Sequence, residues 1–123
     1  MKRLFGVFAA LLGLSAAAQG PDFSSVDSLQ KAQALYERGE LEKVYLFPLD
    51  AGGQDIPQNV VYLPLGLGEM KNKIDGTVSK MAGEGSVSRY SATPEYRGNN
   101  FIPSKIVVRA WDPGDFTATI DVW

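Results

Sequence analysis

The chain has 123 residues, and its 12 Lys and Arg stand against 14 Asp and Glu, which gives a net charge of −2 at pH 7. It contains no His and no Cys. This excludes His-based triads, Cys nucleophiles and His/Cys zinc sites, and leaves only carboxylates, Lys, Tyr and hydroxyl groups for catalysis. We therefore expect no catalytic site, metal or cofactor. The acidic balance also argues against a nucleic-acid partner, because such partners favour clustered basic charge.

The first 18 residues have the pattern of a secretory signal peptide. Lys2 and Arg3 form a positive start, residues 4–14 are an apolar run of eleven, and Ala16 and Ala18 suit a cleavage site. The alternative is an uncleaved anchor helix, but eleven residues span far less than the roughly 30 Å hydrocarbon core of a bilayer. We expect a periplasmic or secreted protein with no stable membrane anchor after cleavage.

Removing 18 of the 123 residues leaves 105, which is enough for one domain with one hydrophobic core. Lys and Arg then fall from 12 to 10 against 14 Asp and Glu, so the net charge becomes −4. Residues 19–25 are predicted to be a flexible leader. Residues 26–123 are predicted to form a single α+β domain.

The first half of this domain shows one helical segment and two strands. From Asp27, apolar side chains recur every three or four residues, which predicts a helix that is capped by Ser25 or Asp27 and ends at Gly39. Residues 44–47 are predicted to be a strand. Residues 59–63 are apolar on both faces, which predicts a central strand that is covered by a helix on one side.

A longer helix is predicted over residues 67–82. Its apolar stripe consists of Leu67, Met70, Ile74, Thr77, Val78 and Met81. The charged residues predicted to lie off that stripe are Glu69, Lys71, Lys73 and Lys80. Gly76 weakens the helix prediction, because glycine costs about 1 kcal/mol relative to alanine in a helix interior.

The last third of the chain is predicted to be three strands, the last two joined by a tight turn. Residues 106–111 and 116–123 alternate between apolar and polar side chains. In the turn between them, Pro113 fixes φ and Gly114 is expected to adopt a positive φ. The order of elements predicts an α+β fold: a curved, mainly antiparallel sheet of about five strands, with one long helix on one face and a shorter N-terminal helix.

Two segments are candidate binding sites. The first places aromatic and guanidinium groups around a turn, at Tyr96, Arg97, Asn99, Asn100 and Phe101. Tyr and Arg are enriched at protein-binding hot spots, so this segment is the predicted contact with another protein. The alternative is that the rings complete the core and the polar residues form the turn.

The second candidate is the loop of residues 50–59, in which Asp50, Asp55 and Asn59 offer oxygen ligands beside two glycines. Its spacing matches no calcium loop, and the alternative is a wide connection whose Asp and Asn side chains bond the backbone. Carboxylate pairs are a further possibility: Glu95 with Asp112, or Asp50 with Asp55, would serve hydrolysis if they shared a cleft. The sequence does not place either pair together.

Two resemblances extend these expectations. LFPLDAGGQDIPQNVVYLP (residues 46–64), IDGTV (74–78) and PEYRGNNFIPSKI (94–106) resemble a group of small uncharacterised exported bacterial proteins, some encoded near polymorphic toxin genes. That resemblance covers most of the mature chain and implies an immunity or accessory role, without site residues. YSATPEYRGNNFIPS (90–104) is similar to a strand-turn-strand of the DNA/RNA non-specific endonucleases. The Asp-Arg-Gly-His motif on which their activity depends is missing here, so no catalytic residue is carried over.

Three functions remain open. The first is an exported, non-catalytic domain that binds another protein, which the first resemblance narrows to an immunity or accessory protein. The second is a structural domain associated with the cell envelope. The third is a small hydrolase that uses carboxylates.

Overall fold

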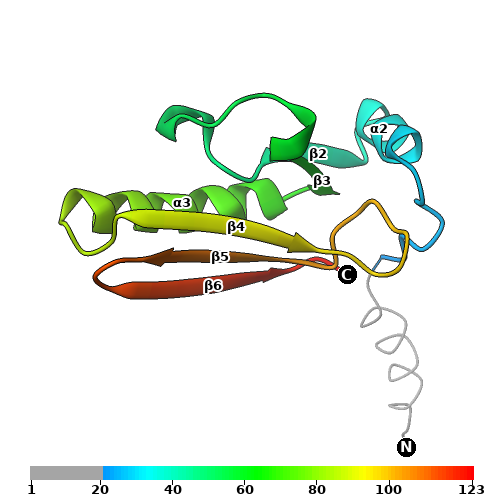
Figure 1. Ribbon diagram of the computed structural model, residues 1–123. Helices are drawn as coiled ribbons and strands as arrows, with labels where there is room; N and C mark the ends of the chain where they lie inside the picture. The colour runs from blue at the N-terminus through cyan, green and yellow to red at the C-terminus, as the bar shows by residue number, and fades with distance from the viewer. Residues whose placement is uncertain (1–20) are drawn as a thin grey trace, which may run out of the picture.

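The computed structural model describes residues 21–123, so the predicted signal peptide lies outside the described residues. Within this range, two helices, two short 3-10 helices and five strands follow one another, which confirms the mixed α+β class (Figure 1). In chain order they are α2 (Leu29–Glu37), β2 (Leu41–Tyr45), η1 (Leu49–Ala51), η2 (Pro57–Asn59), β3 (Val60–Pro64), α3 (Leu67–Gly83), β4 (Arg89–Glu95), β5 (Lys105–Trp111) and β6 (Asp115–Asp121).

The strands form two sheets, so the prediction of a single curved five-strand sheet is wrong. β2 pairs with β3, and β4, β5 and β6 form a separate antiparallel sheet with β5 in the middle. Both sheets bury one face in a shared interior. An alternating pattern reports which face is buried but not which edge pairs with which, so the sequence does not distinguish one sheet from two. α3 contacts β6 and also β2 and β3, and it runs alongside the three-stranded sheet (Figure 1).

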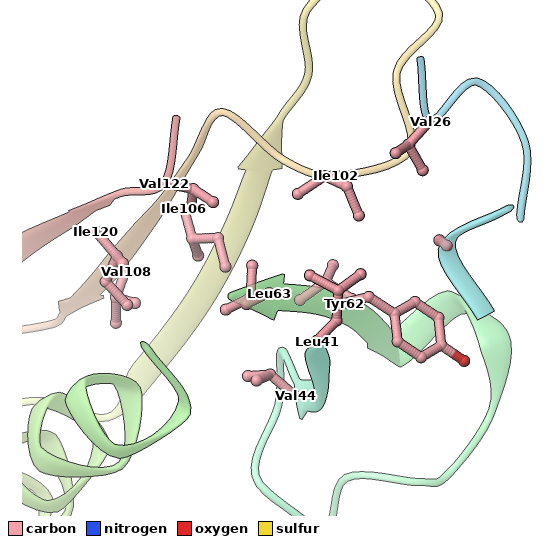
Figure 2. Close-up of a cluster of buried hydrophobic side chains, with 12 residues drawn as sticks. Val26, Leu41, Val44, Tyr62, Leu63, Ile102, Ile106, Val108, Ile120 and Val122 are labelled. Atoms are coloured by element: carbon pink, nitrogen blue, oxygen red, sulfur yellow. The ribbon is translucent and has the colours of Figure 1, made fainter. Parts of the chain in front are cut away.

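One hydrophobic core joins the two sheets. Side chains from β2 and β3 meet side chains from β5 and β6, and residues of the connecting segments close the cluster (Figure 2). The labelled members are Val26, Leu41, Val44, Tyr62, Leu63, Ile102, Ile106, Val108, Ile120 and Val122. The alternation predicted for the last two strands is therefore confirmed, because Ile106, Val108, Ile120 and Val122 occupy alternate positions and all lie in the core. Three consecutive residues of β3, at positions 61–63, are buried, as its two-sided apolar pattern predicted, but β3 pairs with β2 only, so the prediction of a central strand is wrong.

The turn between β5 and β6 lies where the sequence placed it, but its conformation differs. Asp112, with φ of 72°, is the residue in the left-handed region, instead of Gly114. Gly114 meets a different requirement: its N–H donates to the Ser86 carbonyl at 2.8 Å, and a Cβ there would lie 2.7 Å from that oxygen. Close backbone approach explains this glycine.

Several element ends also differ from the prediction. The cap of α2 is Ser28, whose Oγ accepts from the Lys31 N–H at 3.2 Å. β2 begins three residues early, at Leu41, and its Glu42 carboxylate accepts from the N–H groups of Gly66 and Gly68 at 2.6 and 3.1 Å. A side chain on β2 thus caps α3, whose own N-cap residue is a glycine without a side chain.

β6 ends at Asp121, two residues before the predicted end. The backbone N–H groups of Val122 and Trp123 nevertheless both donate to the Ser104 carbonyl, at 2.8 and 3.2 Å. The expected flexible leader also makes contacts in its described part. Phe23 packs edge-on against Trp123 with ring centroids 5.9 Å apart, and its carbonyl accepts from the Asn100 side chain.

Candidate functional site

The two predicted binding segments meet at one groove, which we call the apolar groove. It has a volume of ≈ 460 Å³ and lies beside the start of α2, the η2 turn, β3 and the connection between β4 and β5. Four large apolar side chains on its wall are substantially exposed: Leu29 (43%), Ile56 (42%), Tyr96 (46%) and Phe101 (44%). Isolated exposed hydrophobic residues are ordinary, whereas four around one groove form a patch of the kind that marks interaction sites.

A charged pair forms part of the rim of this groove. Lys43 Nζ lies 3.0 Å from Asp55 Oδ1, and both residues line the groove. The hydrogen bond to Asp55 raises the pKa of Lys43 above its ordinary value. Asp55 is therefore engaged by a cation of the same chain, and at this exposed position the pair contributes more to orientation than to stability.

The other three residues predicted at the first site have different surroundings. Arg97 Nη2 donates to the Trp123 carbonyl at 2.7 Å, and its guanidinium lies 4.7 Å from the Trp123 ring centroid. Asn100 is buried and accepts from the Ile102 N–H at 2.7 Å while its amide donates to Phe23. Asn99 is exposed beside a separate shallow pocket. Arg97 and Asn100 are thus occupied in holding neighbouring segments together.

The loop residues offered as ligands do not converge. Asn59 closes the loop: its Oδ1 accepts from the Phe47 N–H at 2.7 Å, and its Nδ2 donates to the carbonyls of Phe47 and Gln54, each at 2.9 Å. Asp50 lies on η1, away from the apolar groove, whereas Asp55 lines that groove. Within residues 21–123, no group of three or more acidic side chains is placed to hold a metal ion.

The carboxylate pairs considered for hydrolysis are also separated. Glu95 faces Lys105 at one end of the β4–β5 ladder, with their charged atoms 3.7 Å apart. Asp112 follows the other end of β5 and pairs with Arg89 at 3.4 Å. Because the ladder is seven residues long, these two carboxylates lie at opposite ends of the sheet.

The described part of the chain contains a buried polar cluster that the sequence analysis did not predict. Lys71 was predicted to lie off the apolar stripe of α3, but its side chain is 1% exposed. Its Nζ donates to Asp75 Oδ2 at 2.6 Å, to the Leu46 carbonyl at 2.8 Å and to the Tyr90 hydroxyl at 3.0 Å. An ammonium has three donors, so all three are satisfied.

The signal for this cluster was the spacing. Positions 67, 71, 74 and 78 follow the helical repeat, so Lys71 lies on the buried stripe, and Asp75 follows it by one turn. When only the residue type is considered, a lysine is predicted to lie on the surface. A lysine that falls on the apolar stripe of a helix and has a carboxylate four residues later is a candidate for a buried ion pair.

Tyr90 completes the cluster as a hydrogen-bond donor. Its hydroxyl lies 2.6 Å from Asp75 Oδ1 and 3.1 Å from the Leu46 carbonyl, so its single proton belongs to the shorter contact. Burial, reinforced by the Asp75 carboxylate, raises the pKa of the Tyr90 phenol well above 10.0. Burial lowers the pKa of Lys71, and Asp75 opposes that effect. The cluster is a neutral unit whose carboxylate is held in a fixed orientation.

Comparison with family models, curated proteins and solved structures found no match in any of the three. Among residues 21–123, neither helix has the length and apolar character needed to cross a bilayer. A functional assignment for this chain therefore depends on the contacts described above.

Proposed function

We propose that the protein is an exported, non-catalytic domain that binds another protein through the apolar groove. The observation that carries the proposal is the gathering of Leu29, Ile56, Tyr96 and Phe101 around one groove, each more than two-fifths exposed. Covering these side chains removes apolar surface from water, which favours association by about 25 cal/mol per Å² before the costs of binding.

The composition of the groove suits a particular kind of partner. Two aromatic rings and two aliphatic side chains form its apolar part, and Lys43 and Asp55 lie at its rim. Rigid rings supply contact area at little cost in conformational entropy. The fitting partner is a protein segment that presents one or two large apolar side chains with polar groups on either side.

A narrower version of the proposal identifies the partner as a toxin. It follows from the resemblance to small exported proteins encoded near toxin genes, and it makes any toxin encoded beside this gene the first partner to examine. The export component comes from the pattern of residues 1–18. Intact mass of the protein from a periplasmic or culture fraction tests it, and the expected species begins at Gln19.

The test of the groove compares two double variants. Tyr96→Ala/Phe101→Ala removes both aromatic rings from the groove. Met70→Ala/Leu65→Ala is the matched control, because both residues are exposed hydrophobics that do not line it. Circular dichroism and thermal melting must first show that both variants remain folded.

Each variant and the wild type are then used to capture a partner from periplasmic extract, and the partner is purified and titrated by calorimetry. We expect the groove variant to lose binding by at least about tenfold, because hot-spot aromatics contribute 2 kcal/mol or more. The control should bind as the wild type does. A folded groove variant that binds with wild-type affinity overturns the assignment of the groove. The envelope-domain alternative predicts no purified partner at all.

A further inference from the structure

A second pocket, which we call the α3 pocket, lies on a different part of the surface. It has a volume of ≈ 630 Å³ and is bounded by α3, the η1 segment and the first residues of β4. It shares no lining residue with the apolar groove. Small-molecule sites usually occupy about 300–1,000 Å³ and combine an apolar wall with a few polar groups. Here the apolar wall includes Phe47, Val78 and Val87, and the polar groups include Asp50, Asn72 and Asp75.

Gly76 is the first observation that indicates a role for the open volume of the α3 pocket. It lies in the interior of a 17-residue helix, where glycine costs about 1 kcal/mol relative to alanine. A Cβ at this position would meet nothing within 4 Å, so neither close packing nor a positive φ explains the glycine. Gly76 lines the α3 pocket, and its missing side chain leaves that wall open.

The charges around the pocket do not balance. Asp75 is neutralised by Lys71, and Arg89 is paired with Asp112 at 3.4 Å. Asp50 also lines the pocket and forms no ion pair within residues 21–123. The net charge that the lining presents is therefore negative by one unit.

Aromatic rings reinforce this preference. Phe47 and Tyr90 both line the pocket, and their rings meet edge to face with centroids 5.4 Å apart. Aromatic faces attract cations through the ring quadrupole, and the attraction grows when the cation is desolvated. The Tyr90 ring already faces the Lys71 ammonium, 5.7 Å from its centroid, which leaves the Phe47 ring for a ligand. Together with the Asp50 carboxylate, which has no ion pair within the described residues, this ring favours a positively charged ligand over a neutral or anionic one.

We propose that the α3 pocket binds a small organic cation, an amine with a short apolar chain. Asp50 receives the ammonium group, and the apolar chain lies against Phe47 and Val78. The Lys71–Asp75–Tyr90 cluster forms a neutral wall of the pocket, so the charge that a ligand meets there is that of Asp50. Gly76 leaves room for the ligand.

The test uses three probes of equal chain length: hexylamine, hexanol and hexanoate. Each is titrated into the isotopically labelled full mature chain while amide shifts are followed by nuclear magnetic resonance. We expect hexylamine to give saturable shifts that centre on residues 72–79 and 87–90. Hexanol should bind at least about tenfold more weakly, as loss of a charge-assisted contact predicts, and hexanoate should not bind.

Three variants assign the effect to the pocket. Gly76→Leu should abolish the hexylamine shifts by filling the wall. Gly83→Leu is the matched control, because this α3 glycine also has open space around it but does not line the pocket. Asp50→Asn should weaken hexylamine binding about tenfold and reduce its dependence on salt.

Several results would overturn the proposal. Hexylamine shifts that do not saturate, or that survive Gly76→Leu, mean that the pocket is not the site. Equal shifts from hexylamine and hexanoate mean that charge plays no part. These results are independent of partner capture at the apolar groove, so either assignment can fail alone.

Discussion

Lys71 Nζ lies 2.6 Å from Asp75 Oδ2, and the side chains that carry this ion pair are 1% and 13% exposed. The two residues are one helical turn apart on α3. Charges removed from water are costly, and their attraction compensates only while both partners and their hydrogen bonds are present. The pair is therefore a point where losing one partner is far more harmful than losing both.

Asp75→Ala should lower the free energy of unfolding by about 3–5 kcal/mol, because it leaves the Lys71 ammonium buried without a counter-charge. Urea denaturation measures this change. The double variant Lys71→Met/Asp75→Ala removes both charges and should recover most of the lost stability. A double variant less stable than Asp75→Ala alone would contradict this account of the cluster.

The stability of the protein at alkaline pH should depend on the ionisation of the Tyr90 phenol. Its pKa is raised above the ordinary 10.0, first by burial and then by Asp75. The native state then holds this proton more tightly than the unfolded chain does. The resulting stability is fully present below about pH 10 and is lost as pH rises beyond that value.

Tyr90→Phe isolates this effect. Lys71, whose pKa is lowered by burial, has the opposite sign: its contribution to stability rises toward pH 10.5. The wild type and Tyr90→Phe both contain Lys71, so its contribution is common to the two curves. Urea unfolding between about pH 8 and pH 11 should show a steeper loss of stability above pH 10 in the wild type than in Tyr90→Phe. Parallel curves would mean that the phenol titrates alike in both states.

Two glycines should respond to alanine in opposite directions. Gly76→Ala adds a Cβ that meets nothing, so it should raise stability by about 1 kcal/mol. Gly114→Ala places a Cβ 2.7 Å from the Ser86 carbonyl oxygen and should lower stability by about 1–3 kcal/mol. Thermal melting of the two single variants is sufficient. A destabilised Gly76→Ala would show that this position has a packing role.

Removing Val122 and Trp123 should destabilise the domain. Val122 belongs to the core, and Trp123 Nε1 donates to the Ile102 carbonyl at 2.9 Å. Because Trp123 is only partly buried, we expect a loss of about 3 kcal/mol, the lower end of the range for large aromatic residues. Thr119→Ala, on the exposed side of β6, should have little effect. An unchanged melting temperature in the truncated protein would be inconsistent with these contacts.

Local patterns predicted the elements well where one periodicity dominates. The helix predicted over residues 67–82 is α3, and the alternation predicted in the last third matches the alternating burial of β5 and β6. Both signals depend only on neighbours within a few positions. The division into two sheets, with β2 and β3 in one and β4 in the other, depends on how distant segments pack. No local repeat in the sequence encodes that division.

For the candidate sites, too, residue type was predictable from the sequence, whereas long-range packing was not. Tyr96 and Phe101 were singled out for their chemistry, and the structure places them beside Asp55 of the other candidate loop. That meeting is a long-range contact which sequence alone does not specify. Arg97 and Asn100 belong to the same predicted site, but their side chains donate hydrogen bonds to the carbonyls of Trp123 and Phe23. Composition identifies residues that are able to bind, and only packing determines which of them are free to do so.

The edge-to-face contact between Phe23 and Trp123 has a consequence for the connectivity of the chain. It holds two distant positions together, and the start of the described chain lies beside the C-terminus in Figure 1. A short linker between them should support a circular permutant whose new ends lie in the exposed turn at residues 84–85. We therefore expect the elements to pack in the same way when the chain connects them in a different order.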